Sequence, residues 1–579
     1  MNQFSNLTNS VAMKKSLMWL PVSQWGLGYQ KRWLRGDLVA GITVAMMLIP
    51  QAMSYALLAG LPPIIGLYAS IVPLIIYAIF GTSRQLAVGP VAMVALLVAS
   101  GVGAIAEPGS QQFVFLAITL AMMVGVIQLA MGVFRLGFLT NFMSHPVISG
   151  FTSAAAIIIG LSQLKHVLGV DLPRTENAGY LLWLAAEQLL NSHWPSLIIG
   201  VSGIGLLVLL KRVSPLIPGP MVAVVLSTLL VYWFGLDQQG VKIVGDVPPG
   251  LPSFSVPDFN YSQLSALFPI ALTISFVGFM ESIAVAKKIA AEKKYELDAN
   301  MELVGLGLAN IFGAFFKAMP VTGGFSRTAV NNNAGANTGL AAIITAVLIA
   351  LALMFFTPLF FFIPKAILGS IIMVAVYGLI DWQEVKHLWQ VKKEDLILLL
   401  LTFFATLTLG VMNGIIAGIA VSMIWFVVKT TRPHYAILGK LPESNDYRNV
   451  HRYATEEFAN LLIIRFDAQF YYGNVSFLKE TLKKYEQQKG PELSAIVIDA
   501  SSINQLDSSA DTALHELLDS YQTRQIQLHF ANVKGPVRDV MKKSGFWQRL
   551  GADHFHFNVH QAVMSARSPS AASASISVS

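Results

Sequence analysis

Long stretches without any charged side chain alternate with short clusters of Lys and Arg along most of the chain. The first stretch runs from Leu38 to Ser83, and others follow as far as Val428. A helix that crosses a bilayer needs about 20 mostly apolar residues, so each longer stretch has room for two spans joined by a turn. The pattern predicts a polytopic α-helical membrane protein with about fourteen segments of unequal length.

Composition and charge support this prediction. The 579 residues are 54% apolar and only 12% charged, whereas soluble domains carry about 25% charged residues. In a membrane protein the net charge of +7 marks cytoplasmic loops rather than nucleic-acid binding. The chain has no cysteine, no metal-ligand spacing and no nucleotide-binding glycine loop, so we expect no cofactor, no metal site and no ATP-driven step.

The Lys and Arg clusters also predict the orientation. They precede the first span, recur at turns between later spans and follow the last one. By the positive-inside rule both termini are then cytoplasmic, and the loops 165–193 and 237–258 are external. The N-terminus has no cleavable signal peptide, so we expect a multi-pass protein of the cell (inner) membrane.

One stretch, Pro320–Thr338, breaks the apolar pattern with a Pro, a Gly pair, an Arg and three consecutive Asn. At membrane depth, irregular backbone is tolerated only where it is buried in protein or lines a wet cavity, and an Arg there faces a pathway or a partner. A half-helix starting within 322–325 places free N–H groups and a positive helix end inside the membrane, and Arg327 adds a full charge. The stretch predicts a buried anion site.

A similar interruption, at 87–91, lies at the matching place in the first half of the chain. Paired broken segments in two halves indicate an inverted-repeat transporter whose site lies between them. We therefore expect two inverted repeats of seven segments each.

After Arg432 the composition becomes that of a soluble α/β domain. Buried strands are expected at 461–466, 495–500 and 527–532, and helices at 475–488, 508–524 and 534–544. The predicted organisation is an N-terminal cytoplasmic segment (1–34), a transport domain (35–432), a linker (433–457), a cytoplasmic α/β domain (458–565) and a disordered tail (566–579).

Several separated motifs resemble the SulP anion transporters, whose animal relatives form solute carrier family 26. They are the stretch Ile49–Leu97, the stretch Ser275–Phe316 and the sequence PVTGGFSRTAVN. The soluble domain resembles a STAS domain, with Asp507-Ser508-Ser509-Ala510 at a strand–helix junction. One departure is Ile65, where the family commonly has Tyr before Gly-Leu-Tyr.

The resemblance implies core and gate domains built from intertwined repeats, a homodimer paired by its STAS domains, and a cytoplasmic regulatory partner at the STAS domain. It places the substrate between the half-helices of the third and tenth spans. The implied substrate contacts are Gln51, Tyr55, Val91, Ala92, Glu281, Phe325, Ser326 and Arg327. Because Glu281 is a carboxyl group at membrane depth, it is also the candidate coupling group.

Structural alternatives exist for several of these residues. Arg327 and Glu281 are also suited to pair with each other, and Gln51 to hydrogen-bond a neighbouring helix. Asn331–Asn333 fit either the site or the contact between repeats. Ser509 resembles the phosphorylation site of anti-sigma-factor antagonists, but an N-cap is the preferred explanation for Ser or Asp before a helix.

The sequence predicts a non-enzymatic function, which is secondary active transport of a small inorganic anion, with sulfate as the leading candidate and protons rather than sodium as the coupling ion. Bicarbonate and C4-dicarboxylates are the alternative substrates. An uncoupled anion channel and a membrane-anchored signalling protein that senses an anion are the alternative classes.

Overall fold

The computed structural model describes residues 21–138, 144–173, 177–214, 217–257 and 260–567. The N-terminal segment expected at 1–34 is therefore described only from residue 21, and of the expected tail only 566–567 are described. The chain forms two compact units, Met1–Ser422 and Met423–Ser579.

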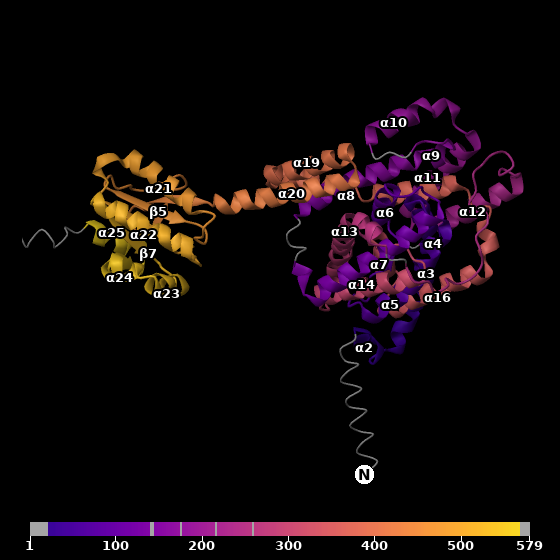
Figure 1. The fold of residues 1–579 in the computed structure, drawn as a ribbon, viewed down its shortest axis with the longest axis horizontal. Helices are drawn as coiled ribbons and strands as arrows, with labels where there is room; N and C mark the ends of the chain where they lie inside the picture. The colour runs from indigo at the N-terminus through magenta and orange to yellow at the C-terminus, as the bar shows by residue number, and fades with distance from the viewer. Residues whose placement is uncertain (1–20, 139–143, 174–176, 215–216, 258–259, 568–579) are drawn as a thin grey trace, which may run out of the picture. The chain divides into compact units, whose positions relative to one another are not determined.

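The first half of the membrane unit begins with a short helix, followed by a long helix that contains Pro50 (Figure 1). It continues to a short strand directly before a half-length helix. Its elements are α2 (Pro21–Gly26), α3 (Lys31–Ala59), α4 (Pro63–Tyr68), α5 (Val72–Phe80), β1 (Val88–Gly89), α6 (Ala92–Gly103), α7 (Gln111–Val133), α8 (His145–Ser162), α9 (Leu164–Leu168), α10 (Ala178–Glu187), η2 (Leu189–Asn191), α11 (Trp194–Val213) and α12 (Gly219–Phe234).

The second half repeats this order, with a long helix that contains Pro269 and a short strand before a short helix. Its elements are α13 (Tyr261–Lys293), α14 (Ala299–Phe315), β2 (Thr322–Gly323), α15 (Phe325–Asn333), α16 (Leu340–Phe355), η3 (Thr357–Phe360), α17 (Lys365–Tyr377), α18 (Trp382–Val391), α19 (Lys393–Leu409) and α20 (Val411–Thr431).

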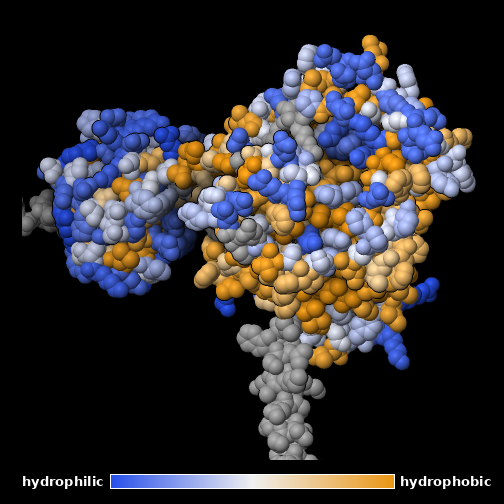
Figure 2. Space-filling view, turned by 45° about the vertical axis from the view of Figure 1, so that its right-hand side comes forward, coloured by the Kyte–Doolittle hydropathy of each residue, from blue (hydrophilic) through white to orange (hydrophobic). Residues whose placement is uncertain are grey.

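Within the described residues, eight helical regions are long and apolar enough to cross a membrane, and four shorter apolar helices accompany them. With α15 and α19 these form the fourteen expected segments, seven in each half, which confirms the polytopic fold. Broad apolar areas cover the surface of this unit, whereas the surface of the second unit is mainly polar (Figure 2).

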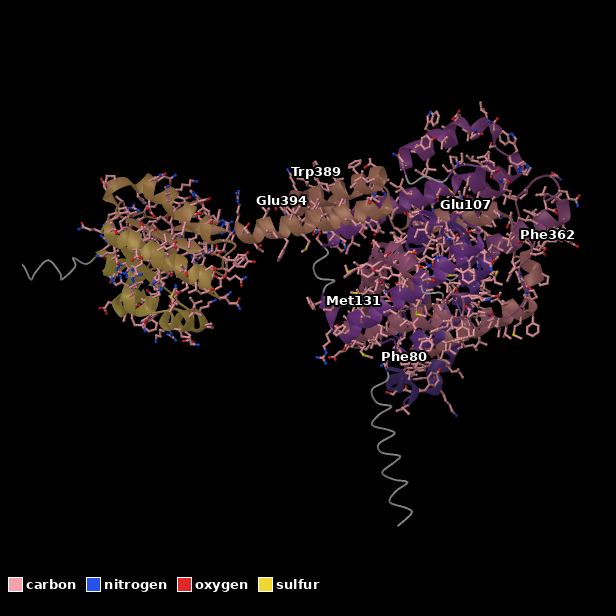
Figure 3. The ribbon with its side chains drawn as sticks, viewed as in Figure 1. Phe80, Glu107, Met131, Phe362, Trp389 and Glu394 are labelled. Carbon is pink, nitrogen blue, oxygen red and sulfur yellow. The ribbon has the colours of Figure 1, made fainter. Side chains whose placement is uncertain are left out.

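Several short helices lie in segments where the sequence pattern predicted no helix, and α10 and α18 are among them. The predicted external loop 165–193 contains α10, and α18 separates α17 from α19. Trp382 and Trp389 are exposed on α18, and Trp389 is labelled in Figure 3. The same helix also carries Lys386 and His387. Aromatic and basic side chains on one short helix are typical of a helix that lies along the membrane interface.

Helices α7 and α14, from different repeats, cross closely because both carry glycine at the contact. A Cβ on Gly125 would lie 2.7 Å from the carbonyl oxygen of Gly307. Next to this crossing, the buried Asn310 donates to Gln128 Oε1 at 3.1 Å and accepts from the backbone N–H of Val321 at 2.8 Å. A buried amide that is satisfied in this way holds the chain just before β2.

The second unit is an α/β domain with one six-stranded sheet in the order β4-β3-β5-β6-β7-β8. Strands β5 to β8 are parallel, as expected, and β3 is antiparallel to both of its neighbours. Its elements are β3 (Tyr435–Lys440), β4 (Tyr447–Asn449), β5 (Leu461–Phe466), α21 (Val475–Lys489), η4 (Gly490–Glu492), β6 (Ala495–Asp499), α22 (Ser508–Thr523), β7 (Gln527–Ala531), α23 (Gly535–Lys543), α24 (Phe546–Leu550), η5 (Ala552–His554), β8 (Phe555–His556) and α25 (Val559–Arg567).

The strands and helices predicted between 461 and 544 agree with these bounds to within one residue. The expectation of a linker at 433–457 does not match the structure, since β3 and β4 both lie there. Ile437 in β3 is buried in the main core of the domain with residues from β5 and β6. The strand was missed because its apolar run is short and the membrane-spanning pattern ends just before it.

Candidate anion-binding site

The two interrupted segments meet as a two-stranded antiparallel ladder in the middle of the membrane unit. Val88 pairs with Gly323 and Gly89 with Thr322. The N–H of Gly324 also donates to the carbonyl oxygen of Ala87 at 3.0 Å. The crossing therefore joins the two repeats at the place where both chains are irregular.

Each strand leads directly into the N-terminus of a short helix. The N-cap of α6 is Val91 and that of α15 is Gly324, and neither supplies a side-chain cap. The half-helix expected to start within 322–325 thus starts at Phe325. Uncapped N–H groups at a helix N-terminus carry a partial positive charge and bind anions, so two such ends lie close together at the crossing.

Arg327 lies in the first turn of α15 and is only 2% exposed. Its Nη1 donates to the carbonyl oxygen of Pro90 at 2.7 Å. Its Nε and Nη2 have no hydrogen-bond partner among the described residues. Buried donors normally have a partner, so the guanidinium offers two unused donors to an acceptor that enters the cavity.

Gly324 makes room for this guanidinium. A Cβ at position 324 would lie 2.8 Å from Nη2 and 2.9 Å from Cζ of Arg327. On the other side, a Cβ on Gly89 would lie 3.4 Å from the same Nη2, and Gly89 also has a positive φ of 154°. The glycines of both interrupted segments therefore fit the guanidinium closely.

A cavity of about 370 Å³ lies beside the crossing and is lined by parts of α3, α6, α11, α12, α13, α15 and α17. We call it the substrate cavity. All eight residues implied by the resemblance line it, although they come from four separate segments: Gln51, Tyr55, Val91, Ala92, Glu281, Phe325, Ser326 and Arg327. Phe325 is 49% exposed, so its ring faces the cavity rather than the core.

Ser282, which follows Glu281 on α13, hydrogen-bonds to β2. Ser282 accepts the N–H of Gly323 at 2.8 Å and contacts the hydroxyl of Thr322 at 2.7 Å. Glu281 itself forms no ion pair with Arg327 within 4.0 Å in the described structure. The carboxyl group and the guanidinium thus lie on the wall of one cavity without forming the structural pair that was the alternative interpretation.

Gln51 and Tyr55 lie one turn apart on α3 and are 3% and 5% exposed. Oε1 of Gln51 has no partner among the described residues, so the helix–helix hydrogen bond considered for Gln51 is not formed through this atom. Two of the three asparagines divide between the two interpretations. Asn331 donates to the carbonyl oxygen of Gln85 at 2.8 Å and joins the repeats, whereas Asn333 lines the cavity.

The sequence did not identify Lys211, which lines the same cavity where α11 ends and is exposed. Its only signal was membership of a basic cluster at a turn. Lys211 and the start of α12, at Gly219 and Pro220, line one side of the cavity.

In the second unit, Asp507 is the N-cap of α22 and accepts the N–H of Ala510 at 2.8 Å. Asp507 also accepts the N–H of Tyr472 at 2.9 Å. Ser509 lies in the first turn and is exposed, so the capping explanation applies to Asp507 and leaves the Ser509 hydroxyl accessible. Among the residues described, no group of His, Asp and Glu is placed to hold a metal ion.

Comparison with known proteins gives two family matches. The model described as Sulfate permease family matches residues 34–402, and the model described as STAS domain matches residues 452–562. The chain is 40% identical over 583 residues to Sulfate transporter 4.1, chloroplastic, of Arabidopsis thaliana. This alignment covers 97% of the chain and 85% of the relative. It is 34% identical to High affinity sulfate transporter 2 of Stylosanthes hamata, with 97% and 88% covered.

Two solved structures are similar in fold. The murine Solute Carrier 26 family member A9 anion transporter, in its inward-facing state, matches with a TM-score of 0.88 at 24% identity and covers 96% of this chain and 95% of that one. The transmembrane domain of the cyanobacterium bicarbonate transporter BicA matches with a TM-score of 0.59 at 24% identity, with 68% and 97% covered.

Proposed function

The chain belongs to the sulfate permease family, and from that premise we propose that it is a secondary active transporter of sulfate. The observation that carries the proposal is the convergence of two uncapped helix N-termini and the Arg327 guanidinium on one cavity. The names of the curated relatives point to the same substrate.

The charge of the site suits a dianion. Each helix N-terminus contributes about half a positive charge and Arg327 contributes one, so the site offers about two positive charges. The N–H groups and the guanidinium replace the water around sulfate with fixed donors. No bond of the substrate changes in this process, so we propose no enzymatic step.

Glu281 supplies the coupling to protons in this proposal. An ionised carboxylate on the wall of the cavity cancels about one of the positive charges and repels sulfate, whereas the protonated acid does neither. Sulfate binding and proton binding then favour each other, and this linkage is reciprocal. Sodium fits less well because Val285, one turn along the same helix, offers no oxygen ligand.

Bicarbonate remains the second candidate substrate, because a structural neighbour is named a bicarbonate transporter and a monoanion uses the same donors. C4-dicarboxylates are the third. An uncoupled channel or an anion-sensing signalling protein uses the same binding groups but does not accumulate substrate.

We further propose that both termini are cytoplasmic and that the protein works in the cell (inner) membrane as a homodimer, with residues 35–432 as the transport domain. The Lys and Arg clusters support this orientation. The STAS domain then serves pairing and regulation, and the accessible Ser509 is a candidate phosphorylation site. A cytoplasmic regulatory protein that reads this site is part of the same proposal.

The test is uptake of labelled sulfate, bicarbonate and a C4-dicarboxylate into proteoliposomes under imposed proton or sodium gradients. We expect sulfate to be taken up fastest and an inward proton gradient to drive it. If another anion is taken up faster, that anion is the substrate instead of sulfate. If the anion never accumulates beyond its electrochemical equilibrium, the protein is a channel.

A further inference from the structure

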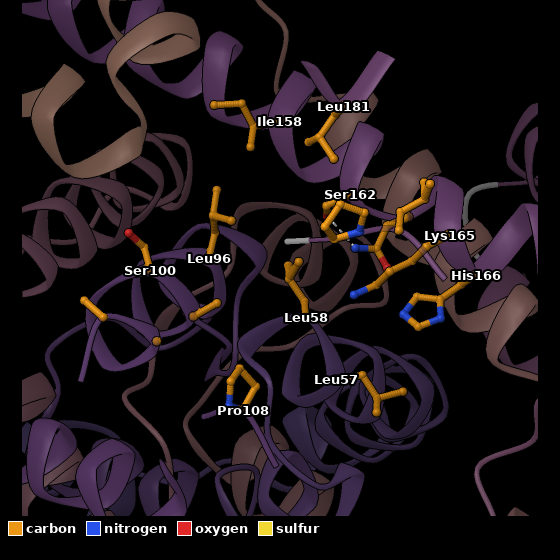
Figure 4. A pocket seen from close by; sticks show the side chains of 16 residues that line it. Leu57, Leu58, Leu96, Ser100, Pro108, Ile158, Ser162, Lys165, His166 and Leu181 are labelled. Atoms are coloured by element: carbon orange, nitrogen blue, oxygen red, sulfur yellow. Dashed lines mark hydrogen bonds between the residues drawn. The ribbon is translucent and has the colours of Figure 1, made fainter. Parts of the chain in front are cut away.

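A second cavity, of about 400 Å³, lies in the membrane unit between the C-terminal parts of α3 and α6 on one side and α8, α9 and α10 on the other. We call it the outer cavity, because α9 and α10 belong to the loop that is external in the proposed orientation. Its lining residues are shown in Figure 4. It shares no lining residue with the substrate cavity.

The two cavities nevertheless follow one another along the same two helices. On α3, Gln51 and Tyr55 line the substrate cavity, and Leu57 and Leu58 line the outer cavity one turn later. On α6, residues 91–93 line the first and Leu96, Ala99 and Ser100 line the second. The cavities are therefore successive parts of one route past α3 and α6.

An apolar layer separates them. Tyr55, Leu58, Met93 and Leu96 are each less than 10% exposed and belong to one hydrophobic core cluster, together with Ile158 of α8. A closed layer of this kind excludes water and a hydrated anion. An anion that arrives in the outer cavity must therefore wait until α3 and α6 move relative to α8.

Among the described residues that line the outer cavity, Lys165 and His166 are ionisable and none is acidic. Both are half-buried, and Figure 4 shows them together on one wall, across from Leu96 and Ser100. The hydroxyl of Ser162 and the amide of Gln163 lie beside them, 2.8 Å apart.

The neighbouring loop brings one carboxylate, that of Asp171, close to these two residues. Asp171 is paired with Lys242, and the pKa of its carboxyl is lowered chiefly by that hydrogen bond and further by the charges of Lys165 and His166. Asp171 does not line the cavity, whereas Lys165 and His166 do.

We propose that the outer cavity is a capture site for a small oxyanion, which Lys165 and His166 hold before the apolar layer opens. The inference rests on the proposed transport function for the identity of the anion. Its largely apolar opposite wall makes the site weaker than the substrate cavity, as suits a site from which the anion must leave inward.

The first test measures sulfate uptake from the α10 face in proteoliposomes. We expect Lys165→Gln to raise the KM for sulfate on that face at least fivefold, with kcat changed less than twofold and with the KM for sulfate presented on the other face unchanged. Lys165→Arg should restore the wild-type KM. Lys365→Gln, a charge removal at a residue that lines neither cavity, is the matched control and should leave the KM unchanged. An equal KM in wild type and Lys165→Gln on the α10 face overturns the proposal.

The second test does not depend on transport. Because the chain has no cysteine, Ala99→Cys creates a single thiol in the outer cavity. Sulfate should slow its modification by a negatively charged methanethiosulfonate reagent added from the α10 face, and Lys165→Gln should raise the half-protecting sulfate concentration at least fivefold.

Protection of this introduced thiol should persist when Arg327→Ala is added, because the capture site is separate from the substrate cavity. Loss of protection in that background would mean that sulfate acts from the substrate cavity, and the proposal would fail. If sulfate protects the introduced thiol although the protein transports no sulfate, the capture site is supported and the proposed transport function is refuted.

Discussion

Arg327 on α15 donates from Nη1 to the carbonyl oxygen of Pro90, 2.7 Å away and 237 residues earlier in the chain. This one hydrogen bond joins the irregular segments of the two repeats. The bond uses only Nη1 of the guanidinium, and Nε and Nη2 have no hydrogen-bond partner among the described residues. The same side chain therefore holds the crossing together and presents donors to the cavity.

Replacing Arg327 with Ala should lower the affinity for sulfate at least tenfold. A hydrogen bond to a charged group contributes about 1.5–3 kcal/mol, and the helix ends alone supply about half a charge each. Arg327→Lys should retain part of the affinity, because the charge remains but the planar fork is lost. Initial uptake rates over a range of sulfate concentrations measure both effects. Uptake by the Ala variant with an unchanged KM, in protein that elutes as wild type, would remove Arg327 from the site.

Gly324→Ala should impair transport through the position of Arg327. The added Cβ would lie 2.8 Å from Nη2, so the guanidinium must move, and overpacking of this kind costs about 1–3 kcal/mol. We expect a raised KM and a lower midpoint of thermal unfolding in detergent. Gly205→Ala on α11 is the control, because a Cβ there meets nothing within 4 Å. Equal behaviour of the two variants would contradict the close fit at Gly324.

The STAS domain should lose stability on mild acidification because of His529. Burial lowers the pKa of His529 from 6.5 to about 3, and the neighbouring His554 and His556 contribute to this lowering. The unfolded chain then binds a proton below about pH 6.5 that the folded domain does not bind. The contribution of neutral His529 to the free energy of unfolding is therefore fully present above that pH. It falls by roughly 1.4 kcal/mol per pH unit of acidification until about pH 3.

Urea unfolding of a fragment beginning at Met423, at pH 7 and pH 5, tests this directly. His529→Gln should lose about 2 kcal/mol less than wild type between these two values. His451→Gln, at an exposed position, should behave as wild type. The lowered pKa of Asp467 acts only at lower pH, since a carboxylate of depressed pKa loses its contribution below about pH 4. The same loss in all three proteins would contradict the assignment to His529.

Much of this site follows from local sequence. A Pro, paired glycines and an Arg in an apolar stretch are sufficient to predict a half-helix, and its first residue, Phe325, falls within the predicted interval. The strands β5 to β7 also follow from short runs of apolar, mostly β-branched or aliphatic residues between turns. These features depend on neighbours in the chain, so the sequence displays them.

The remaining features depend on contacts between distant residues. The pairing of Val88 with Gly323 joins positions in different repeats, and the hydrophobic periodicity of the sequence does not predict it. In the sequence Asn310 is an isolated polar residue in an apolar helix. Only the fold shows that its side-chain oxygen accepts a hydrogen bond from the N–H of Val321. The outer cavity is likewise lined by residues of α3, α6, α8, α9 and α10, which are far apart in the sequence.

The central claim is that Glu281 couples sulfate to protons in the cavity that Arg327 lines. The most direct test is accumulation of labelled sulfate by proteoliposomes with an imposed inward proton gradient, in wild type and in Glu281→Gln, with sulfate–sulfate exchange measured in parallel. We expect wild type to concentrate sulfate above equilibrium, and the Gln variant to exchange sulfate at a comparable rate without concentrating it. Accumulation by Glu281→Gln equal to that of wild type would contradict the account.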